Sequence, residues 1–515
     1  MPRKPAFLLV LAALSVSGYL LTARATYRLG FPLDDAWIHQ TYARNLAQRG
    51  EWAFVPGKPS AGSTAPLWTF LLIPPHLGGG SPYAWTFALG MALLAGLAWG
   101  GMRTLEVWLP DLPAGWRWAG GVFLLLEWHM VWAASSGMET LLAAFWALAV
   151  VLWLSAGKRR RGLLGAFIGA GVWVRPDLLT LLGPALWVVF FDELRIAKFR
   201  GADLAQADAG AAESAWREAL RRVLSQSGKL LAGFALGFLP YLVFNRLLAG
   251  AWWPNTFYAK QNEYAILREI PFLARLGREL TLPLVGAGAL LLPGAVWFLW
   301  QAWRRRQWAV LGSALWFLGY IAVYAWRLPV TYQHGRYVMP AMPVFFLLGL
   351  AGVLDATLRD GLPLGGRVLA RGWLLSLGVV LLLFYALGGR AYGQDVAVIG
   401  SEMGAVARWV NANTPKGSLV AAHDIGALGY FGERDILDLA GLVSPEVIPF
   451  LRDEERLARF LDGKGASYLV TFPGWYPRLV ACGDLVYRTG GMFSPLLGGE
   501  NMAVYRWRGN CLANE

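Results

Sequence analysis

The chain alternates between long apolar blocks and short polar segments, many of which are basic. Many of the apolar blocks have about 17 to 22 residues, enough for a helix to cross a bilayer core of roughly 30 Å. We expect about eleven membrane-spanning helices, at residues 6–21, 83–101, 119–134, 138–154, 162–174, 178–191, 230–248, 282–301, 310–325, 339–354 and 373–387. The pattern predicts an α-helical polytopic membrane protein.

The basic segments predict the orientation of these helices. Arginine and lysine cluster at residues 158–161, at 304–306 and between 359 and 371, and such clusters favour the cytoplasmic side. The N-terminus is then cytoplasmic, and the plasma membrane of the cell is the expected location. The loop 23–82 and the chain after residue 388 are extracytoplasmic. Cleavage after Ala23-Arg24-Ala25, as in a signal peptide, is an alternative for the first block.

The first outer loop and the C-terminal segment have their own patterns. Residues 66–77 are apolar but contain Pro74-Pro75 and are too short to cross, so they predict interfacial helices. After residue 388, short β-rich runs at 418–422, 435–439, 467–472 and 502–507 alternate with helical patterns at 403–411 and 454–461. We expect a membrane part at 1–388 and a small α/β domain at 389–515.

Composition supports a membrane protein and adds two constraints. Hydrophobic residues make up 56% of the chain and charged residues 15%, and mean hydropathy is +0.44. The net charge of +13 comes from the basic loops, which argues against a nucleic-acid partner. Both cysteines, Cys482 and Cys511, lie in the C-terminal domain, and they form either one disulfide or two separate thiols. No His or Cys cluster indicates a zinc site.

A pair of adjacent acids opens a predicted helix in the first outer loop. Asp34 and Asp35 precede apolar residues at helical spacing, and Gly50 follows the last of them. An aspartate at a helix start is usually an N-cap. Two adjacent carboxylates near an apolar surface repel each other, which raises the pKa of one and suits a general base. Capping and catalysis both remain open, and His39 lies one turn after Asp35.

Other outer segments carry charge where a predicted span meets the surface. A charge at that depth is costly unless it is paired or hydrated, although long side chains also extend to the lipid headgroups. Glu139, Arg175, Lys260 and Arg336 are all predicted on the side of the paired aspartates. One shared outer cavity would explain them together, with acids activating a nucleophile and basic groups holding a phosphate.

Several of these segments resemble the GT-C superfamily of membrane glycosyltransferases, which use polyprenyl-phosphate sugars. The nearest group is the bacterial arabinofuranosyltransferase-like proteins. The matching pieces are Asp34-Asp35 with residues 42–46, residues 62–68, 136–140, Arg175-Pro176-Asp177, 254–260, Arg336-Tyr337 with Pro340 and Pro343, 424–430 and 438–442. Asp177 departs from the usual glutamate of its motif.

The resemblance implies a function and roles for residues. It implies an inverting transfer of sugar from a polyprenyl-phosphate donor to an extracytoplasmic glycan, lipid or protein hydroxyl, with membrane lipids around the enzyme. Asp34 or Asp35 would be the catalytic base, with Asp34 favoured, and Arg336, Arg175 and Lys260 would bind the donor phosphate. The expected substrate-binding residues are His39, Tyr42, Arg44, Glu139, Asn255, Tyr258, His334 and Tyr337. No cofactor is implied, and a divalent cation between the aspartates and phosphate stays open.

Two other functions fit a polytopic chain. A flippase or transporter for lipid-linked sugars would place its site near the bilayer midplane on broken helices. In this chain the acids gather at one surface, which favours the transferase. An envelope assembly protein that binds through its C-terminal domain is the second alternative, and the paired aspartates would then be incidental.

Overall fold

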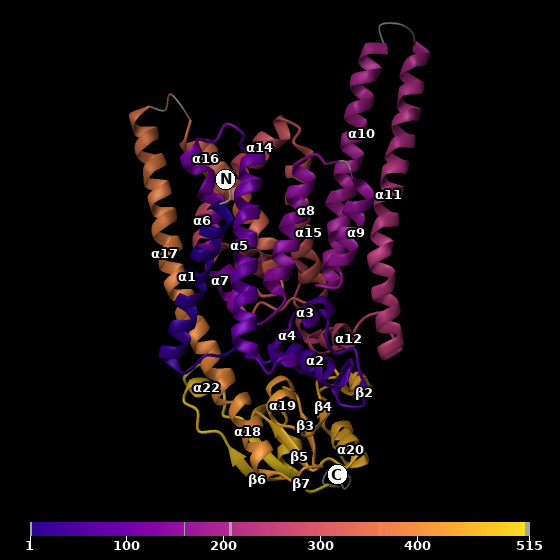
Figure 1. Ribbon diagram of the computed structural model, residues 1–515, viewed down its shortest axis with the longest axis vertical. Helices are drawn as coiled ribbons and strands as arrows, with labels where there is room; N and C mark the ends of the chain where they lie inside the picture. Colours follow the sequence, from indigo (N-terminus) through magenta and orange to yellow (C-terminus); the bar gives the residue numbers. More distant parts are fainter. Residues whose placement is uncertain (1–2, 159, 205–208, 360, 362, 510–515) are drawn as a thin grey trace.

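The computed structural model describes residues 3–158, 160–204, 209–359, 361 and 363–509. Long helices form a bundle, and a small sheet domain caps one of its ends (Figure 1). The bundle helices are α1 (Arg3–Thr26), α5 (Pro82–Trp108), α6 (Ala119–Leu126), α7 (Trp128–Ser135), α8 (Thr140–Ser155), α9 (Arg161–Gly171), α10 (Leu182–Leu204), α11 (Ala209–Ala249), α14 (Ala287–Arg304), α15 (Trp308–Arg327), α16 (Met342–Thr357) and α17 (Leu364–Ser401). Short 3-10 turns join them at η1 (Ala114–Trp118), η2 (Pro176–Leu181), η5 (Gln333–Gly335) and η6 (Met339–Ala341).

Each of the eleven predicted spans coincides with helical structure, so the helical bundle is confirmed. Within the described residues, six helices are long and apolar enough to cross a membrane. A seventh candidate is a pair bent by 104°, Phe272–Leu284 with Ala287–Arg304. The other predicted spans fall on the shorter helices α6, α7, α8 and α9 and on η2 with α10. They pack on their neighbours inside the bundle, as α9 does on α11 through close glycine contacts.

The predicted span 119–134 is broken in its middle. Residues 119–134 divide into α6 and α7 at Glu127, which is buried. The Glu127 carboxylate accepts the backbone N–H of Met130 at 3.2 Å and lies 2.7 Å from Nδ1 of His129. The acid therefore caps α7 and satisfies donors that the break would otherwise leave unpaired.

The first outer loop contains the expected short helices. Its elements are α2 (Asp35–Arg49), β1 (Ala53–Val55), β2 (Lys58–Pro59), α3 (Pro66–Leu71) and α4 (Pro74–Leu77). The loop between α11 and α14 adds α12 (Asn255–Glu263), η3 (Ala265–Glu269), α13 (Phe272–Thr281) and η4 (Leu282–Leu284). Figure 1 places α2, α3, α4 and α12 between the bundle and the sheet domain.

The sheet domain, called the tail below, follows α17. Its elements are α18 (Met403–Asn413), β3 (Leu419–Ala422), α19 (Gly426–Phe431), β4 (Asp435–Asp438), η7 (Pro445–Phe450), α20 (Glu454–Lys464), β5 (Tyr468–Thr471), η8 (Pro473–Trp475), α21 (Pro477–Ala481), β6 (Gly483–Arg488), α22 (Phe493–Leu496) and β7 (Ala503–Trp507). The strand order is β4-β3-β5-β7-β6, with the first three parallel and the last two antiparallel to their neighbours.

A continuous helix joins the bundle to the tail, since α17 continues beyond the apolar block and through residue 388. The start of α17 lies at the end of the bundle away from the tail, as does the N-terminus (Figure 1). Cys482 is buried in the tail. Cys511, with which it would form the disulfide left open above, lies outside the described residues.

Candidate active site

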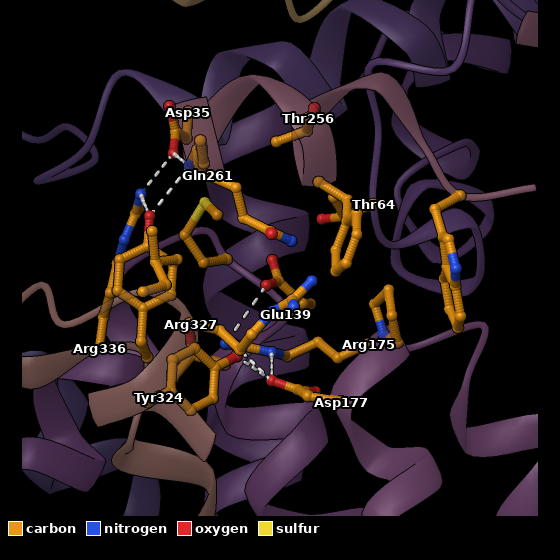
Figure 2. Close-up of a pocket in the computed structure, with 18 of the residues that line it drawn as sticks. Asp35, Thr64, Glu139, Arg175, Asp177, Thr256, Gln261, Tyr324, Arg327 and Arg336 are labelled. Atoms are coloured by element: carbon orange, nitrogen blue, oxygen red, sulfur yellow. Dashed lines mark hydrogen bonds and ion pairs between the residues drawn. The ribbon is translucent and has the colours of Figure 1, made fainter. Parts of the chain in front are cut away.

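A cavity of about 450 Å³ opens where the bundle meets the first outer loop. Figure 2 shows its polar side chains, which come from segments far apart in the sequence. The loop segments contribute Asp35, Thr64 and Glu139, the bundle contributes Arg175, Asp177, Tyr324 and Arg327, and α12 contributes Thr256, Lys260 and Gln261. Arg336 and Tyr337, after η5, complete this polar lining. Seven of the predicted site residues meet here: Asp35, His39, Glu139, Arg175, Lys260, Arg336 and Tyr337.

Asp35 is paired with two cations at one side of the cavity. Its Oδ2 accepts hydrogen bonds from Arg336 Nη2 at 2.6 Å and from Lys260 Nζ at 3.2 Å. The hydroxyl of Tyr337 accepts from the same two donors, each at 3.1 Å. Burial alone would raise the pKa of Asp35, but the charges of Lys260 and Arg336 outweigh it and hold the pKa far below its usual value. The carboxylate is therefore ionised at neutral pH.

Arg336 has donors that its protein neighbours do not satisfy. The side chain is buried, with 5% of the residue exposed, and only Nη2 is bonded within the described part of the chain. Its Nε and Nη1 are buried without a hydrogen-bond partner there. Leaving a buried donor without a hydrogen bond costs about 1–3 kcal/mol, and more for a charged group. Such an arginine at a cavity wall is suited to a carboxylate or phosphate ligand, which accepts two parallel N–H bonds.

Arg175 belongs to a separate cluster in the same cavity. It donates to Asp177 Oδ2 at 2.9 Å and to the Tyr324 hydroxyl at 2.7 Å, and it lies 3.7 Å from Glu139 Oε1. The second oxygen of Glu139 is 3.5 Å from Nε2 of His39. Two carboxylates thus balance the guanidinium, as Figure 2 shows. Arg175 holds the side chains of this wall in place. Its charge is balanced by these carboxylates, so it is less available to a ligand than the charge of Arg336.

Asp34 makes quite different contacts from Asp35. Its two oxygens accept the backbone N–H groups of Gly426 at 2.7 Å and Ala427 at 2.8 Å, which open α19 in the tail. Burial and the nearby Asp424 carboxylate raise the pKa of Asp34 to about 8, although these N–H bonds act in the opposite direction. A Cβ at Gly426 would come 2.0 Å from the Asp34 carbonyl oxygen, so only glycine fits this junction. Asp34 attaches the tail to the first outer loop.

We expect Asp34→Asn to loosen this attachment. Asparagine offers one side-chain acceptor where aspartate offers two, so one buried backbone N–H at the start of α19 loses its partner. The loss should lower stability by about 1–3 kcal/mol. Thermal unfolding in detergent and limited proteolysis of the tail would measure it. Asp111→Asn, in an exposed loop, is the matched control and should behave as wild type. Equal stability of all three proteins would contradict the assignment.

Comparison with known proteins adds to this geometry. A family described as a domain of unknown function, DUF8728, matches residues 390–505, most of the tail. No curated protein matches the chain by sequence. Oligosaccharyltransferase from Archaeoglobus fulgidus in the apo form superposes with a TM-score of 0.55 at 12% identity, over 91% of this chain and 69% of that one. Oligosaccharyltransferase AglB from the same organism, in complex with an inhibitory peptide and a dolichol-phosphate, has a TM-score of 0.51 at 12% identity over 91% of this chain and 69% of that one.

A second protein aligns over nearly its whole length. ArnT from Cupriavidus metallidurans, bound to undecaprenyl phosphate, has a TM-score of 0.54 at 14% identity, over 97% of this chain and 98% of that one. The chain has the GT-C fold. The mycobacterial arabinofuranosyltransferase AftD also aligns, over 97% of this chain and 41% of that one, at 16% identity and a TM-score of 0.46.

The other residues predicted from the GT-C resemblance lie outside the cavity lining. Tyr42 hydrogen-bonds the Ser60 hydroxyl at 2.6 Å, and Arg44 donates to backbone carbonyls of α19. Asn255 is buried at the start of α12, Tyr258 is partly exposed on the same helix, and His334 lies 2.7 Å from Asp395. In this structure Tyr42 holds the first outer loop together, and Arg44 attaches that loop to the tail.

The first cavity also contains polar residues that the sequence pattern did not predict as site residues. Asp177 and Gln261 each lie beside or within a predicted motif, and that adjacency was a usable signal. Tyr324 and Arg327 end α15, where the apolar pattern carried no sign of a site. Asp177 also accepts from the Tyr320 hydroxyl at 2.7 Å, so one carboxylate connects η2 to α15. In the described residues, no group of three or more His, Cys, Asp or Glu side chains could hold a metal ion.

The tail contributes to the cavity as well. Leu442, in the loop after β4, lines it, and the Asp438 carboxylate shapes that loop by accepting the N–H groups of Ala440 at 2.8 Å and Val443 at 2.7 Å. Glu263, one turn after Lys260 on α12, lies 2.9 Å from both His423 and Arg452 of the tail. These contacts fix the helix that carries Lys260.

A second cavity, of about 620 Å³, lies between the bundle and the tail. Asp35 lines both cavities, whereas Asp34 lines only the second. The remaining acidic lining is Asp395, Asp424 and Glu500, and the aromatic lining is Trp132, Phe472 and Trp475. Asp35 therefore stands where two differently charged spaces meet.

Proposed function

We propose that this protein is a membrane glycosyltransferase that moves a sugar from a polyprenyl-phosphate donor to an acceptor hydroxyl, with Asp35 as the base. The observation that carries the proposal is the ion cluster of Asp35, Lys260 and Arg336 at the wall of the first cavity. It combines a carboxylate with two cations, one of which has unused buried donors. Such a cluster suits a reaction in which a proton leaves one substrate while a phosphate departs from the other.

The first cavity has the chemistry of a donor site. Arg336 and Lys260 supply charge for a phosphate, and the fold relatives ArnT and AglB were solved with undecaprenyl phosphate and dolichol-phosphate. An apolar groove lined by Phe272, Ala322, Val323 and Trp326 shares Val323 and Trp326 with the cavity. A polyprenyl chain would lie in this groove while its phosphate enters the cavity, because the groove offers it only apolar contacts.

The reaction would proceed by direct displacement. The acceptor hydroxyl gives its proton to an oxygen of Asp35, and its oxygen attacks the anomeric carbon of the donor sugar. The bond between that carbon and the phosphate oxygen breaks, and polyprenyl phosphate leaves with the electron pair. Arg336 and Lys260 stabilise the charge on the departing phosphate. Attack from the face opposite the phosphate inverts the anomeric centre.

The location follows from charge. Lys158, Arg160 and Arg161, and residues 304–306, lie at or between the ends of bundle helices, and such residues favour the cytoplasmic side. We place the N-terminus in the cytoplasm and the tail with both cavities on the extracytoplasmic side of the plasma membrane. A polyprenyl-linked sugar and an envelope acceptor would then meet at Asp35.

Binding of the sugar donor should raise the pKa of Asp35. Without a ligand, Lys260 and Arg336 hold the pKa of Asp35 low, which makes the carboxylate a weak base. A bound phosphate competes for both cations and adds negative charge, and both effects raise that pKa. We therefore expect the acid limb of kcat, which reports the donor complex, at a higher pH than the acid limb of kcat/KM, which reports the free enzyme. Because the pKa of Asp35 in the free enzyme lies far below its usual value, steady-state kinetics from pH 4 to 8 should show an Asp35 limb in kcat alone. Coincident limbs, or the reverse order, would contradict this account.

A reconstituted assay tests the proposed function. Purified protein in lipid would receive a panel of polyprenyl-phosphate sugars and a membrane-envelope acceptor extract, and mass spectrometry would follow free polyprenyl phosphate and the glycosylated product. We expect release that requires the protein and Asp35. A folded preparation that binds undecaprenyl phosphate but moves it between leaflets without releasing sugar would overturn the proposal in favour of a flippase.

A further inference from the structure

The second cavity, between the bundle and the tail, has lining residues that point to a ligand of a particular class. From the tail come Phe472, Gly474 and Trp475 after β5 and residues 497–500 before β7, and from the bundle come Trp132 and Asp395. Its volume of about 620 Å³ falls within the usual range for small-molecule sites. Since Asp35 lines this cavity too, a molecule bound here would lie against the proposed base.

The charge of this lining is negative. Five acids line the cavity, Asp34, Asp35, Asp395, Asp424 and Glu500, and the described lining includes no lysine or arginine. Asp34, whose pKa is raised to about 8, carries little charge at neutral pH, so the negative charge comes mainly from the other four. Oδ2 of Asp424 is buried and has no hydrogen-bond partner in the described chain. Ionised carboxylates only accept hydrogen bonds, so they favour ligands rich in hydroxyl donors. They also repel phosphate and carboxylate groups, which directs anionic molecules to the first cavity instead.

Trp475 gives the cavity an aromatic wall. Its residue is 41% exposed, although it packs on Phe472 with ring centroids 5.0 Å apart. The Arg452 guanidinium lies 5.6 Å from the centroid of the same ring. The part of the indole that stays exposed suits the C–H face of a sugar ring, which is apolar while its rim carries hydroxyls. Glu500 lies beside this wall, because its Oε2 accepts the Gly474 N–H at 2.7 Å. Ring and carboxylate together match the two kinds of surface on a saccharide.

We infer that the second cavity is the acceptor site and that the acceptor is a saccharide without anionic groups, stacked on Trp475 with its hydroxyls on the surrounding carboxylates. The inference rests on the proposed function, since it takes the first cavity as the donor site. It assigns a binding role to the tail. Residues 472–475 and 497–500 select the acceptor, while Asp35 receives the proton of the acceptor hydroxyl that reaches it.

Binding measurements with matched sugars test this assignment. Uncharged methyl glycosides of common hexoses and pentoses, the corresponding sugar phosphates, and glucosamine would be offered to the full chain in nanodiscs, with saturation-transfer NMR as the readout. We expect at least one uncharged glycoside to bind, at least tenfold more tightly than its phosphate. Trp475→Ala should weaken that binding at least tenfold, Trp475→Phe should retain most of it, and Trp116→Ala, at an exposed 3-10 turn, should leave it unchanged. Glu500→Gln should reduce the discrimination against the sugar phosphate.

The outcomes separate the two proposals. Binding of undecaprenyl phosphate would be measured in the same preparations. Undecaprenyl phosphate that binds in an Arg336-dependent way, while no glycoside binds, would show that the acceptor assignment is wrong and the donor site is right. The same conclusion would follow if the Trp475→Ala variant bound glycosides as wild type does. If a sugar phosphate bound more tightly than its uncharged glycoside, or if glucosamine were the only sugar to bind, the assignment of an uncharged saccharide as the acceptor would also be wrong. If the wild-type protein does not bind undecaprenyl phosphate, the proposed function itself is wrong.

Discussion

Asp35→Asn should lower the rate of sugar transfer by about 100- to 10,000-fold, the usual contribution of a general base. Asparagine keeps the size and one acceptor oxygen for Arg336 and Lys260, but it cannot take the proton of the acceptor hydroxyl. The substitution also removes the negative charge that competes with the donor phosphate for both cations. Undecaprenyl phosphate should therefore bind as tightly as in wild type or more tightly. Product formation and lipid binding, measured on the same protein, would show the two opposite effects.

The matched control is the neighbouring acid. Asp34→Asn changes the same functional group one residue away but affects the junction with α19, so it should lower stability more than it lowers the chemical rate. Transfer should be lost in the double variant with alanine at both positions while the protein still inserts. A result in which Asp35→Asn turns over normally and Asp34→Asn is inactive but folded would reverse the assignment of the base.

The contrast between these two acids shows what the sequence could not specify. The pattern predicted a helix beginning at the pair, and α2 does begin at Asp35. Adjacent helical residues point about 100° apart, so the two side chains had to enter different surroundings. The surroundings themselves depend on partners hundreds of positions away: Gly426 for Asp34 and Arg336 for Asp35. Local spacing carries no information about such partners.

The membrane part was easier to predict than the site because its signal is local. Apolar blocks must form helices in lipid, since their backbone groups have no other partners there. The break at Glu127 could not be predicted, because one acid in an apolar block gives no helix-stop signal by itself. The cluster around Arg175 was found in part: Arg175 and Glu139 were selected from charge, but Tyr324 became relevant only once α15 packed beside η2. The predicted role of Arg175 as a phosphate ligand stays a prediction.

Arg336→Gln should give the second largest loss, about 100- to 1,000-fold in turnover, the typical cost of removing one preorganised donor to a developing charge. Glutamine retains a hydrogen bond toward Asp35 but supplies neither the positive charge nor the free Nε and Nη1 donors of the buried guanidinium. The loss should appear in kcat and in the affinity for undecaprenyl phosphate, because the same donors contact the phosphate before and during its departure. Arg336→Lys should recover part of the affinity and little of the rate, since one ammonium group cannot bond Asp35 and the phosphate through a rigid fork.

An arginine outside the site provides a control for the effect of Arg336→Gln. Arg359→Gln removes an equal charge from the connection between α16 and α17, where Arg359 pairs with Asp355 at 2.9 Å, away from both cavities. It should leave turnover and lipid binding unchanged. If Arg336→Gln binds undecaprenyl phosphate as wild type does and loses only rate, Arg336 acts on the chemical step without holding the resting donor, and Lys260 becomes the main phosphate ligand. If Arg336→Gln loses neither, its buried donors have another partner and the first cavity is not the donor site, because no other buried cation in its wall combines contact with Asp35 and unused N–H groups among the described residues.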